Sequence, residues 1–298
     1  MREILYPYLI SEEQNNMKIG ITTGGYVHRY GYEKGLERMR AHGYETLDYG
    51  DFSDTETPLF EITEAEFEST LKNQRAQIEA AGIEIFQVHG PWRWPMRDFT
   101  PEDREERFEK MAKSIRGTAV LGCKHFVIHN IMPFGGVDTD PVAAVKMNEE
   151  FFGNLLRIAE EYKVIICMEN MPFLQQALAK PADMLAFVKR FDSPYMRMCL
   201  DTGHCSVHGL SPADAVRTIG KDYLCVMHVH DNDGKGDRHW LPYTGVIDWD
   251  DYAKALQEIN YEGSVSLETN VSGDPKKEDL TEAELALAHS ALRIAGRA

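Results

Sequence analysis

Long hydrophobic runs are missing from this 298-residue sequence. No stretch approaches the roughly 18 consecutive apolar residues of a transmembrane helix. The opening segment, MREILYPYLISEEQNN, lacks the basic stretch followed by an apolar stretch that marks a secretory signal. Neither a membrane span nor export is therefore expected, and a cytoplasmic location is the prediction.

Cysteine is also scarce, and its pattern excludes two kinds of small stabilised domain. The chain has five cysteines, an odd number, and none of them forms a CxxC pair. This argues against a disulfide framework and against a zinc knuckle. Reduced thiols are expected at all five positions: Cys123, Cys167, Cys199, Cys205 and Cys225.

Basic residues are fewer than acidic residues in this sequence. Lys and Arg number 32 against 48 Asp and Glu, which gives a net charge of −16. Such a chain repels phosphodiester backbones and anionic lipid surfaces at long range, so no nucleic-acid or membrane partner is expected. A bound metal ion can still reverse the field inside one cleft.

What the sequence does contain is a regular alternation of strand and helix patterns. Short β-branched or apolar runs, typical of strands, are separated by longer segments of helical period. These runs are 17–23, 45–50, 83–90, 124–130, 164–170, 196–204, 224–231 and 264–270. Eight such units in about 250 residues predict an α/β fold, a single-domain (β/α)8 TIM barrel over residues 17–298, preceded by an N-terminal extension over 1–16.

Helix-start signals support this alternation. Thr63 precedes Glu66 by three residues, and Thr100, Asp140 and Ser211 each stand directly before a proline. The turn after the first strand, TTGGY, lacks the GxGxxG pattern, so a dinucleotide-binding sheet is the weaker alternative. The segment 231–245 is long and polar for a strand-to-helix connection, which favours a functional loop.

Acidic and imidazole side chains stand where consecutive strands are expected to end. They are His89, His129, Glu169, Asp201, His228 and Glu268. The carboxyl ends of barrel strands converge on one face, where active sites of this fold are built. Each residue alone is more often a hydrogen-bonded core or capping group, but six together indicate a common site.

Three carboxylates brought together require a compensating charge. Glu169, Asp201 and Glu268 would repel one another strongly without a cation. With His228 they form an oxygen-rich ligand set that suits manganese or magnesium, with cobalt or zinc as alternatives. A metal ion held in this way can chelate a substrate, polarise its carbonyl and stabilise an enediolate.

The motifs that carry these residues resemble a known family, the xylose-isomerase-like barrels. They are MEN (168–170), LDTGH (200–204), HVHDNDG (228–234), GVIDW (245–249) and SLETN (266–270). The family includes sugar-phosphate isomerases, ketose 3-epimerases and inosose dehydratase-like proteins, and the resemblance spans Met17 to Asn270. It implies that Glu169 and Glu268 both bind the metal and transfer the proton, and that Asp201 and His228 complete the ligand set. His230 is the competing candidate, because the HVH pair leaves the register open.

The resemblance also implies a carbohydrate substrate, which would place the chain in carbohydrate metabolism. His204, His89, Trp92 and Trp240 are the candidates for substrate contacts, although burial is the commoner role of a tryptophan. The predicted activity is an isomerase or epimerase, with a lyase or dehydratase on a similar substrate as an alternative. Barrels of this class often pair, so a homo-oligomer is a further expectation.

The same superfamily contains a rival function, the endonuclease IV type of abasic-site nuclease, which holds three zinc ions. His129, Asp237 and His239 are candidates for additional metal ions, together with His89 and His204. The charge of −16 opposes a DNA-binding surface.

The chain also departs from its sugar-converting relatives. LPYTG replaces a PGEG-like run, and Gly234 stands where ketose epimerases carry an arginine. The particular sugar therefore stays open.

Overall fold

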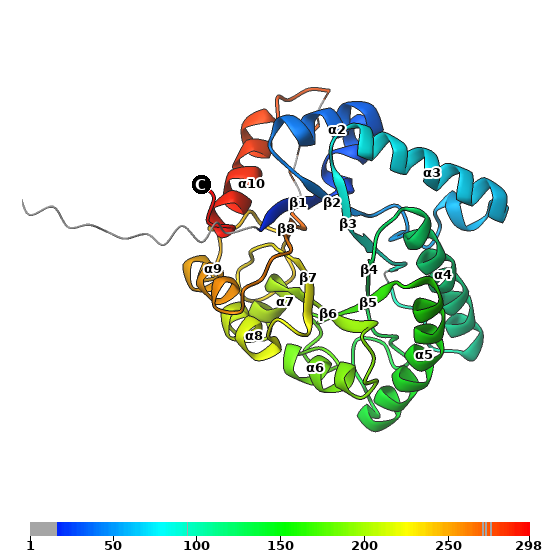
Figure 1. Cartoon of the computed structure of the whole chain (residues 1–298). Coiled ribbons are helices and arrows are strands. Elements are labelled where there is room, and N and C mark those ends of the chain that lie inside the picture. Colours follow the sequence, from blue (N-terminus) through cyan, green and yellow to red (C-terminus); the bar gives the residue numbers. More distant parts are fainter. Residues whose placement is uncertain (1–16, 94, 270, 272, 275) are drawn as a thin grey trace, which may run out of the picture.

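The computed structural model describes residues 17–93, 95–269, 271, 273–274 and 276–298, and in it the strands form a ring surrounded by helices (Figure 1). The expected extension 1–16, Asn270 of the SLETN motif and Trp94 lie outside the described residues. The strands are β1 (Lys18–Thr22), β2 (Thr46–Tyr49), β3 (Glu84–His89), β4 (His125–Ile128), β5 (Ile165–Glu169), β6 (Met196–Asp201), β7 (Leu224–His228) and β8 (Ser264–Leu267).

All strand pairs are parallel and follow the order β7-β6-β5-β4-β3-β2-β1-β8. The two ends of this sheet meet just beyond β7, where Val229 pairs with Leu267 and the Val229 amide donates to the carbonyl of Ser266 at 2.9 Å. The expected (β/α)8 barrel is thereby confirmed.

Helices fill each connection of the barrel wall. They are η1 (Thr23–Gly25), α1 (Val27–Tyr30), α2 (Tyr32–Ala41), η2 (Pro58–Phe60), α3 (Glu64–Ala80), α4 (Pro101–Val120), α5 (Pro141–Tyr162), α6 (Pro181–Lys189), α7 (Thr202–Val207), α8 (Pro212–Ile219), α9 (Trp249–Glu258) and α10 (Thr281–Ile294). The predicted start signals are confirmed. Thr63 and Thr100 form capping boxes, while Asp140 and Ser211 accept a backbone N–H of the first turn.

Several strands end earlier than their sequence patterns predict, and two of them, β6 and β7, end next to site residues. The run 196–204 leaves the sheet at Asp201 because its carboxylate accepts the amide of His204 at 2.6 Å and so caps α7. The run 224–231 is regular only to His228, and the segment 231–245 contains no helix or strand. Both early ends release polar residues from the sheet onto the same face of the barrel.

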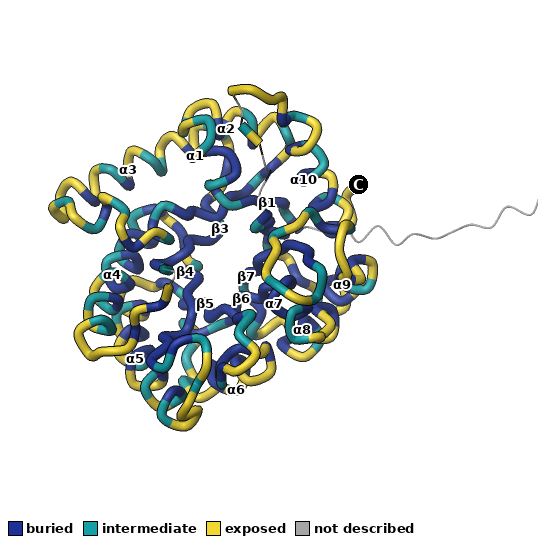
Figure 2. Tube along the Cα trace, turned by 180° about the vertical axis from the view of Figure 1, so that it is seen from behind, coloured by how far each residue is buried: buried dark blue, intermediate teal, exposed yellow. Residues whose placement is uncertain are grey.

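The strands of the ring are buried, as Figure 2 shows by their dark blue colour inside a wall of helices whose outer parts are yellow. A layer of small apolar side chains, Val127, Cys167, Cys199 and Val226, packs inside the barrel. This layer lies below the strand ends and closes the barrel from beneath. No described helix combines the length and apolar character needed to cross a membrane.

The last helix is tied to α2 by a buried carboxylate, and this contact provides a test of the fold. Glu284 on α10 is fully buried and accepts hydrogen bonds from the Tyr30 hydroxyl at 2.6 Å and from the Arg38 guanidinium. Glu284→Ala leaves both donors without their acceptor. We expect the free energy of unfolding to fall by about 3 kcal/mol, measured by urea denaturation.

Glu282→Ala is the matched control, because Glu282 is exposed on the same helix. It should change the free energy of unfolding by less than about 0.5 kcal/mol. Equal stabilities of the two variants would contradict a structural role for the Glu284 contacts.

Candidate active site

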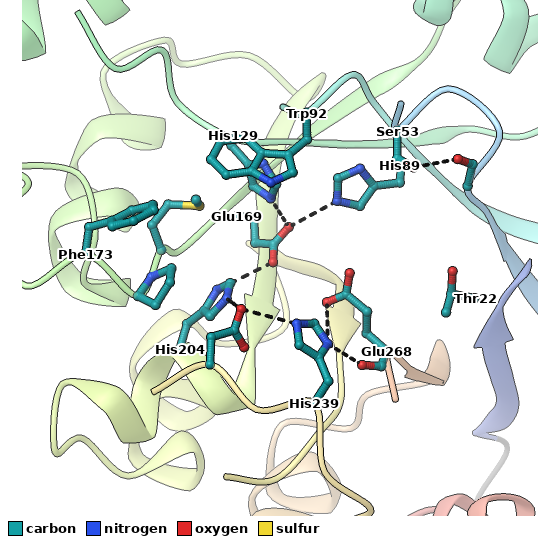
Figure 3. A pocket seen from close by; sticks show the side chains of 14 residues that line it. Thr22, Ser53, His89, Trp92, His129, Glu169, Phe173, His204, His239 and Glu268 are labelled. Carbon is teal, nitrogen blue, oxygen red and sulfur yellow. Dashed lines mark hydrogen bonds and ion pairs between the residues drawn. The ribbon is translucent and has the colours of Figure 1, made fainter. Parts of the chain in front are cut away.

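A cavity of about 490 Å³ opens at the carboxyl ends of the strands (Figure 3). Ligand-type side chains line its floor, and aromatic and apolar groups line its rim. The lining residues are Thr22, Gly50, Ser53, His89, Trp92, His129, Glu169, Met171, Pro172, Phe173, His204, Asp237, His239 and Glu268. Four of the six residues predicted at the strand ends line this cavity: His89, His129, Glu169 and Glu268. The other two, Asp201 and His228, are fully buried and are not among its lining residues.

Glu169 stands at the centre of this cavity floor. It is the last residue of β5, and its side chain is 1% exposed. One carboxylate oxygen, Oε2, lies 3.0 Å from Nε2 of His129 and 3.9 Å from Nε2 of His89. The other, Oε1, lies 3.1 Å from Nδ1 of His228 and 3.6 Å from Nδ1 of His204. Imidazoles from four different strand ends thus converge on a single carboxylate.

Glu268 also approaches the imidazole of His228. It follows β8 directly, and its backbone amide donates to the carbonyl of Val229 at 3.1 Å. Its Oε2 lies 3.4 Å from Nδ1 of His228, and its side chain is 24% exposed. Glu169 and Glu268 therefore both lie close to one nitrogen atom of His228.

Asp201 is bound to a different imidazole. Its Oδ2 lies 3.1 Å from Nε2 of His230, and its Oδ1 lies 3.6 Å from Nδ1 of His204. Asp201 and His228 are register partners in the sheet, yet the side chain of Asp201 meets the histidine two residues further on. Of the four predicted ligands, Glu169, His228 and Glu268 meet directly, and His204 links Asp201 to them.

The two histidines of the HVH pair, His228 and His230, are both fully buried beside the site. His228 uses Nε2 to bond Oδ2 of Asp48 at 3.0 Å, which leaves only Nδ1 facing the two glutamates. His230 lies beside Asp201, and its ring stacks on that of His239 at a centroid distance of 4.2 Å. The choice of His228 as a ligand stays a prediction, with His230 as the alternative nearer Asp201.

The long loop after β7 adds a further carboxylate and a further imidazole. Asp237 lies 3.4 Å from Nε2 of His204, 3.4 Å from Nε2 of His230 and 3.2 Å from Nε2 of His239. His239 has a positive φ of 51°, a backbone conformation that few residues other than glycine adopt. Its Nδ1 donates to the carbonyl oxygen of Glu268 at 2.5 Å, so the loop is fastened to β8.

The electrostatics of the site pair buried carboxylates with imidazoles. Burial would raise the pKa of Glu169, but the charge of His228 and the contact with His129 hold it well below its usual range. Burial would lower the pKa of His204, yet Asp201 and Asp237 raise it to about 10. Buried carboxylates and imidazoles are therefore in contact throughout the site, and a metal ion would compensate the carboxylate charge.

Several groups of three side chains have ligand atoms within 4.8 Å of one another, close enough to hold an ion. They are His89 with His129 and Glu169; His89 with His228 and Glu268; Glu169 with Cys199 and His228; Asp201 with His204 and His230; and His230 with His239 and Glu268. Mixed carboxylate and imidazole donors of this kind suit divalent transition metals.

The two tryptophans predicted to contact substrate have different positions. Trp92 lines the cavity, and its ring lies edge-on to that of His129 at 4.6 Å. Trp240 is 40% exposed and is not among the lining residues; its backbone pairs with that of Asp231 at 2.9 Å in both directions. A substrate contact by Trp240 stays a prediction.

Sequence reasoning missed two buried carboxylates behind the site. Asp48 on β2 orients His228, and Gln87 donates to the same Asp48 oxygen at 3.1 Å. Asp231 accepts the indole N–H of Trp249 at 2.8 Å and the amide of Gly245 at 2.9 Å, and so shapes the loop after β7. The alternation within the run 45–50 places Asp48 on the barrel interior. An acidic residue at a buried strand position needs a partner, and this could have identified Asp48 as part of the site.

A family model and several known proteins are similar to this chain. Residues 36–291 match the family model of the xylose isomerase-like TIM barrel. An uncharacterised protein of Methanocaldococcus jannaschii is 29% identical over 193 residues, which cover 61% of this chain and 65% of that protein. A D-psicose 3-epimerase of Enterocloster bolteae is 24% identical over 86% of this chain and 83% of its own length.

Solved structures share the fold. A D-psicose 3-epimerase crystallised with D-fructose has a TM-score of 0.75 at 19% identity, covering 94% of this chain and 100% of that one. The IolI protein with a bound zinc atom has a TM-score of 0.75 at 17% identity, covering 94% and 99%. On the extent of the family match, this chain belongs to the xylose isomerase-like TIM barrel family.

Proposed function

We propose that this protein is a metal-dependent sugar isomerase or epimerase that transfers a proton next to the carbonyl of a metal-chelated sugar or cyclitol. The observation that carries the proposal is the placement of Glu169 and Glu268, 3.1 and 3.4 Å from the same nitrogen of His228 at the floor of the cavity. The similarity to a D-psicose 3-epimerase over 86% of the chain supports the same reaction class.

The donor set fits a divalent cation. Nδ1 of His228 is buried without a hydrogen-bond partner among the described residues, although two carboxylates flank it. We propose Glu169, Asp201, His228 and Glu268 as ligands of manganese or magnesium, with cobalt or zinc as alternatives. The bound ion supplies polarisation of the substrate carbonyl.

The side chains of the protein supply proton transfer and substrate binding. The Glu268 carboxylate, partly exposed to the cavity, accepts the proton from the carbon next to the carbonyl. Glu169 takes up a proton from solvent and returns it to that carbon from the opposite face. His89 and His204 line the cavity beside Glu169, where they can donate to substrate oxygens. Trp92 covers the sugar ring at the rim and limits access of water.

Solvent exchange tests the proposal. The metal-loaded protein is incubated with ketoses and inososes in deuterated water, and deuterium on the substrate carbon is measured by NMR. We expect label to enter at least one substrate, because abstraction and return of a proton exchange it with solvent. Absence of label throughout the panel would remove the support for proton transfer.

An elimination begins with the same proton abstraction. A lyase or dehydratase on a sugar-like substrate is therefore the alternative within this class. Mass spectrometry of the products separates the two, since elimination lowers the substrate mass by one water.

One observation favours a second candidate, a zinc-dependent nuclease of the endonuclease IV type. His129 and His239 each belong to a group that could hold a further ion, and Asp237 lies 3.2 Å from Nε2 of His239. Three zinc ions per chain and cleavage of DNA at an abasic site would support this function. The net charge of −16 opposes DNA binding, so the carbohydrate reaction is preferred.

A further inference from the structure

A second groove adjoins the catalytic cavity and is not used by the reaction proposed above. It has a volume of about 610 Å³ and is built from the loops that follow β2 and β3. Its lining residues are Ser53, Asp54, Thr55, Glu56, Trp92, Arg93, Pro95 and Arg97. Ser53 and Trp92 also line the catalytic cavity, so the two spaces share a wall.

The walls of this groove are fastened to the barrel. The two loops pair through a backbone bridge between Asp54 and Trp92, and the amide of Trp92 donates to the carbonyl of Ser53 at 2.7 Å. Lys110 on α4 donates to the carbonyl of Thr55 at 2.9 Å. A groove held in this way is preformed, which lowers the entropic cost of binding a ligand.

The chemical character of the groove is polar, aromatic and balanced in charge. Two acids, Asp54 and Glu56, face two arginines, Arg93 and Arg97, beside the ring of Trp92. Nη2 of Arg93 is buried without a hydrogen-bond partner, and Arg97 is exposed and makes no hydrogen bond or ion pair with any described residue. Asp54 already accepts the amide of Glu56 at 2.9 Å, and Nη1 of Arg93 already pairs with Glu106 at 3.2 Å. The remaining donors, Nη2 of Arg93 and the Arg97 guanidinium, stand beside an aromatic face together with two acids, which suits a neutral polyhydroxylated ring better than an anion.

We infer that the substrate is a glycoside or disaccharide whose reacting sugar occupies the catalytic cavity while its second sugar ring occupies this groove. The inference rests on the proposed function for the identity of the first ring. The second ring packs on Trp92 and accepts hydrogen bonds from Arg97, and its hydroxyls donate to Glu56. The groove therefore selects for substrate length.

Isomaltulose, in which a glucosyl group is attached to a fructose end that can open to the ketone, is the probe, with D-fructose as the single-ring comparison. Saturation-transfer difference NMR on the whole metal-loaded protein reports which ring protons touch it, whether or not turnover occurs. Contacts are expected on both rings. Arg97→Ala should lower the affinity for isomaltulose about tenfold, the effect of losing one hydrogen bond from a charged donor.

Arg40→Ala is the matched control, because Arg40 is an exposed arginine at the opposite end of the barrel. It should leave the affinity for isomaltulose unchanged. Absence of glucosyl contacts, or equal affinities of the Arg97→Ala variant and the unmodified protein, overturns the inference. Tighter binding of D-fructose 6-phosphate than of isomaltulose, lost in Arg97→Ala, would also overturn it, by assigning the groove to an anion.

Deuterium exchange separates this inference from the proposed function. If neither sugar exchanges label but the glucosyl ring still touches the groove, the proposed reaction fails and the groove assignment stands. If D-fructose exchanges label and isomaltulose makes no glucosyl contacts, the reaction stands and the groove assignment fails.

Discussion

Glu268→Gln is expected to lower the rate of solvent-proton exchange into the substrate by about 10³-fold or more. The amide keeps the shape and one oxygen ligand of Glu268 but cannot accept a proton, and general-base catalysis contributes about 10²–10⁴-fold. Because the Glu268 side chain is 24% exposed, the substitution should not disturb folding. The measurement is deuterium incorporation at saturating substrate, with metal content checked in the same sample.

Glu262→Gln is the matched control for this experiment. Glu262 is exposed and precedes β8 at the opposite end of the strand. It should leave the exchange rate unchanged. Full activity of Glu268→Gln would exclude Glu268 as the base, whereas unchanged ligand affinity with no exchange in either protein would identify a sugar-binding protein without turnover.

Removal of the metal is expected to abolish the exchange reaction and to lower the melting temperature by about 5–11 °C. An ion present at a hundred times its dissociation constant stabilises the folded state by about 2.7 kcal/mol, and each kcal/mol corresponds to roughly 2–4 °C in a domain of this size class. Without the ion, Glu169 and Asp201 lose its charge compensation and keep their contacts with His228 and His230. Calorimetry before and after chelation, with activity restored by manganese or magnesium, checks both effects.

The number of ions bound decides between the two enzyme classes. One manganese or magnesium ion per chain is expected from elemental analysis. Three zinc ions, with Asp237→Ala losing one of them, would support the nuclease. A protein that is fully active and equally stable after exhaustive chelation would contradict any metal-dependent mechanism.

Local patterns in the chain were sufficient to predict the architecture. The alternating runs predicted every strand position, and Thr63, Thr100 and Ser211 begin helices as their sequence context indicates. These signals are readable because period and capping depend on near neighbours along the chain. The strand end at Asp201 was misplaced because a carboxylate that caps a helix looks, in sequence, like one more strand residue. β7 ends at His228 although Val229 continues the apolar pattern.

Contacts inside the site could not be predicted in the same way. Asp201 and His228 are neighbours in the sheet register, but Asp201 contacts His230, and the support of His228 by Asp48 joins residues 180 positions apart. Such contacts depend on the tilt and stagger of strands around the barrel and on side-chain rotamers. The position of Trp240 away from the cavity follows from its backbone pairing with Asp231, which no periodicity reveals.

The sequence by itself determined that eight strand and helix units form a barrel and that acidic and imidazole residues gather at one end of it. Periodicity and connection order suffice for that conclusion, since parallel strands bring their carboxyl ends together. Only the tertiary structure decided which imidazole faces which carboxylate, and that the loops after β2 and β3 enclose a second groove beside Trp92. Those outcomes depend on packing among residues distant in the chain, where small changes in strand stagger move a side chain from one partner to another.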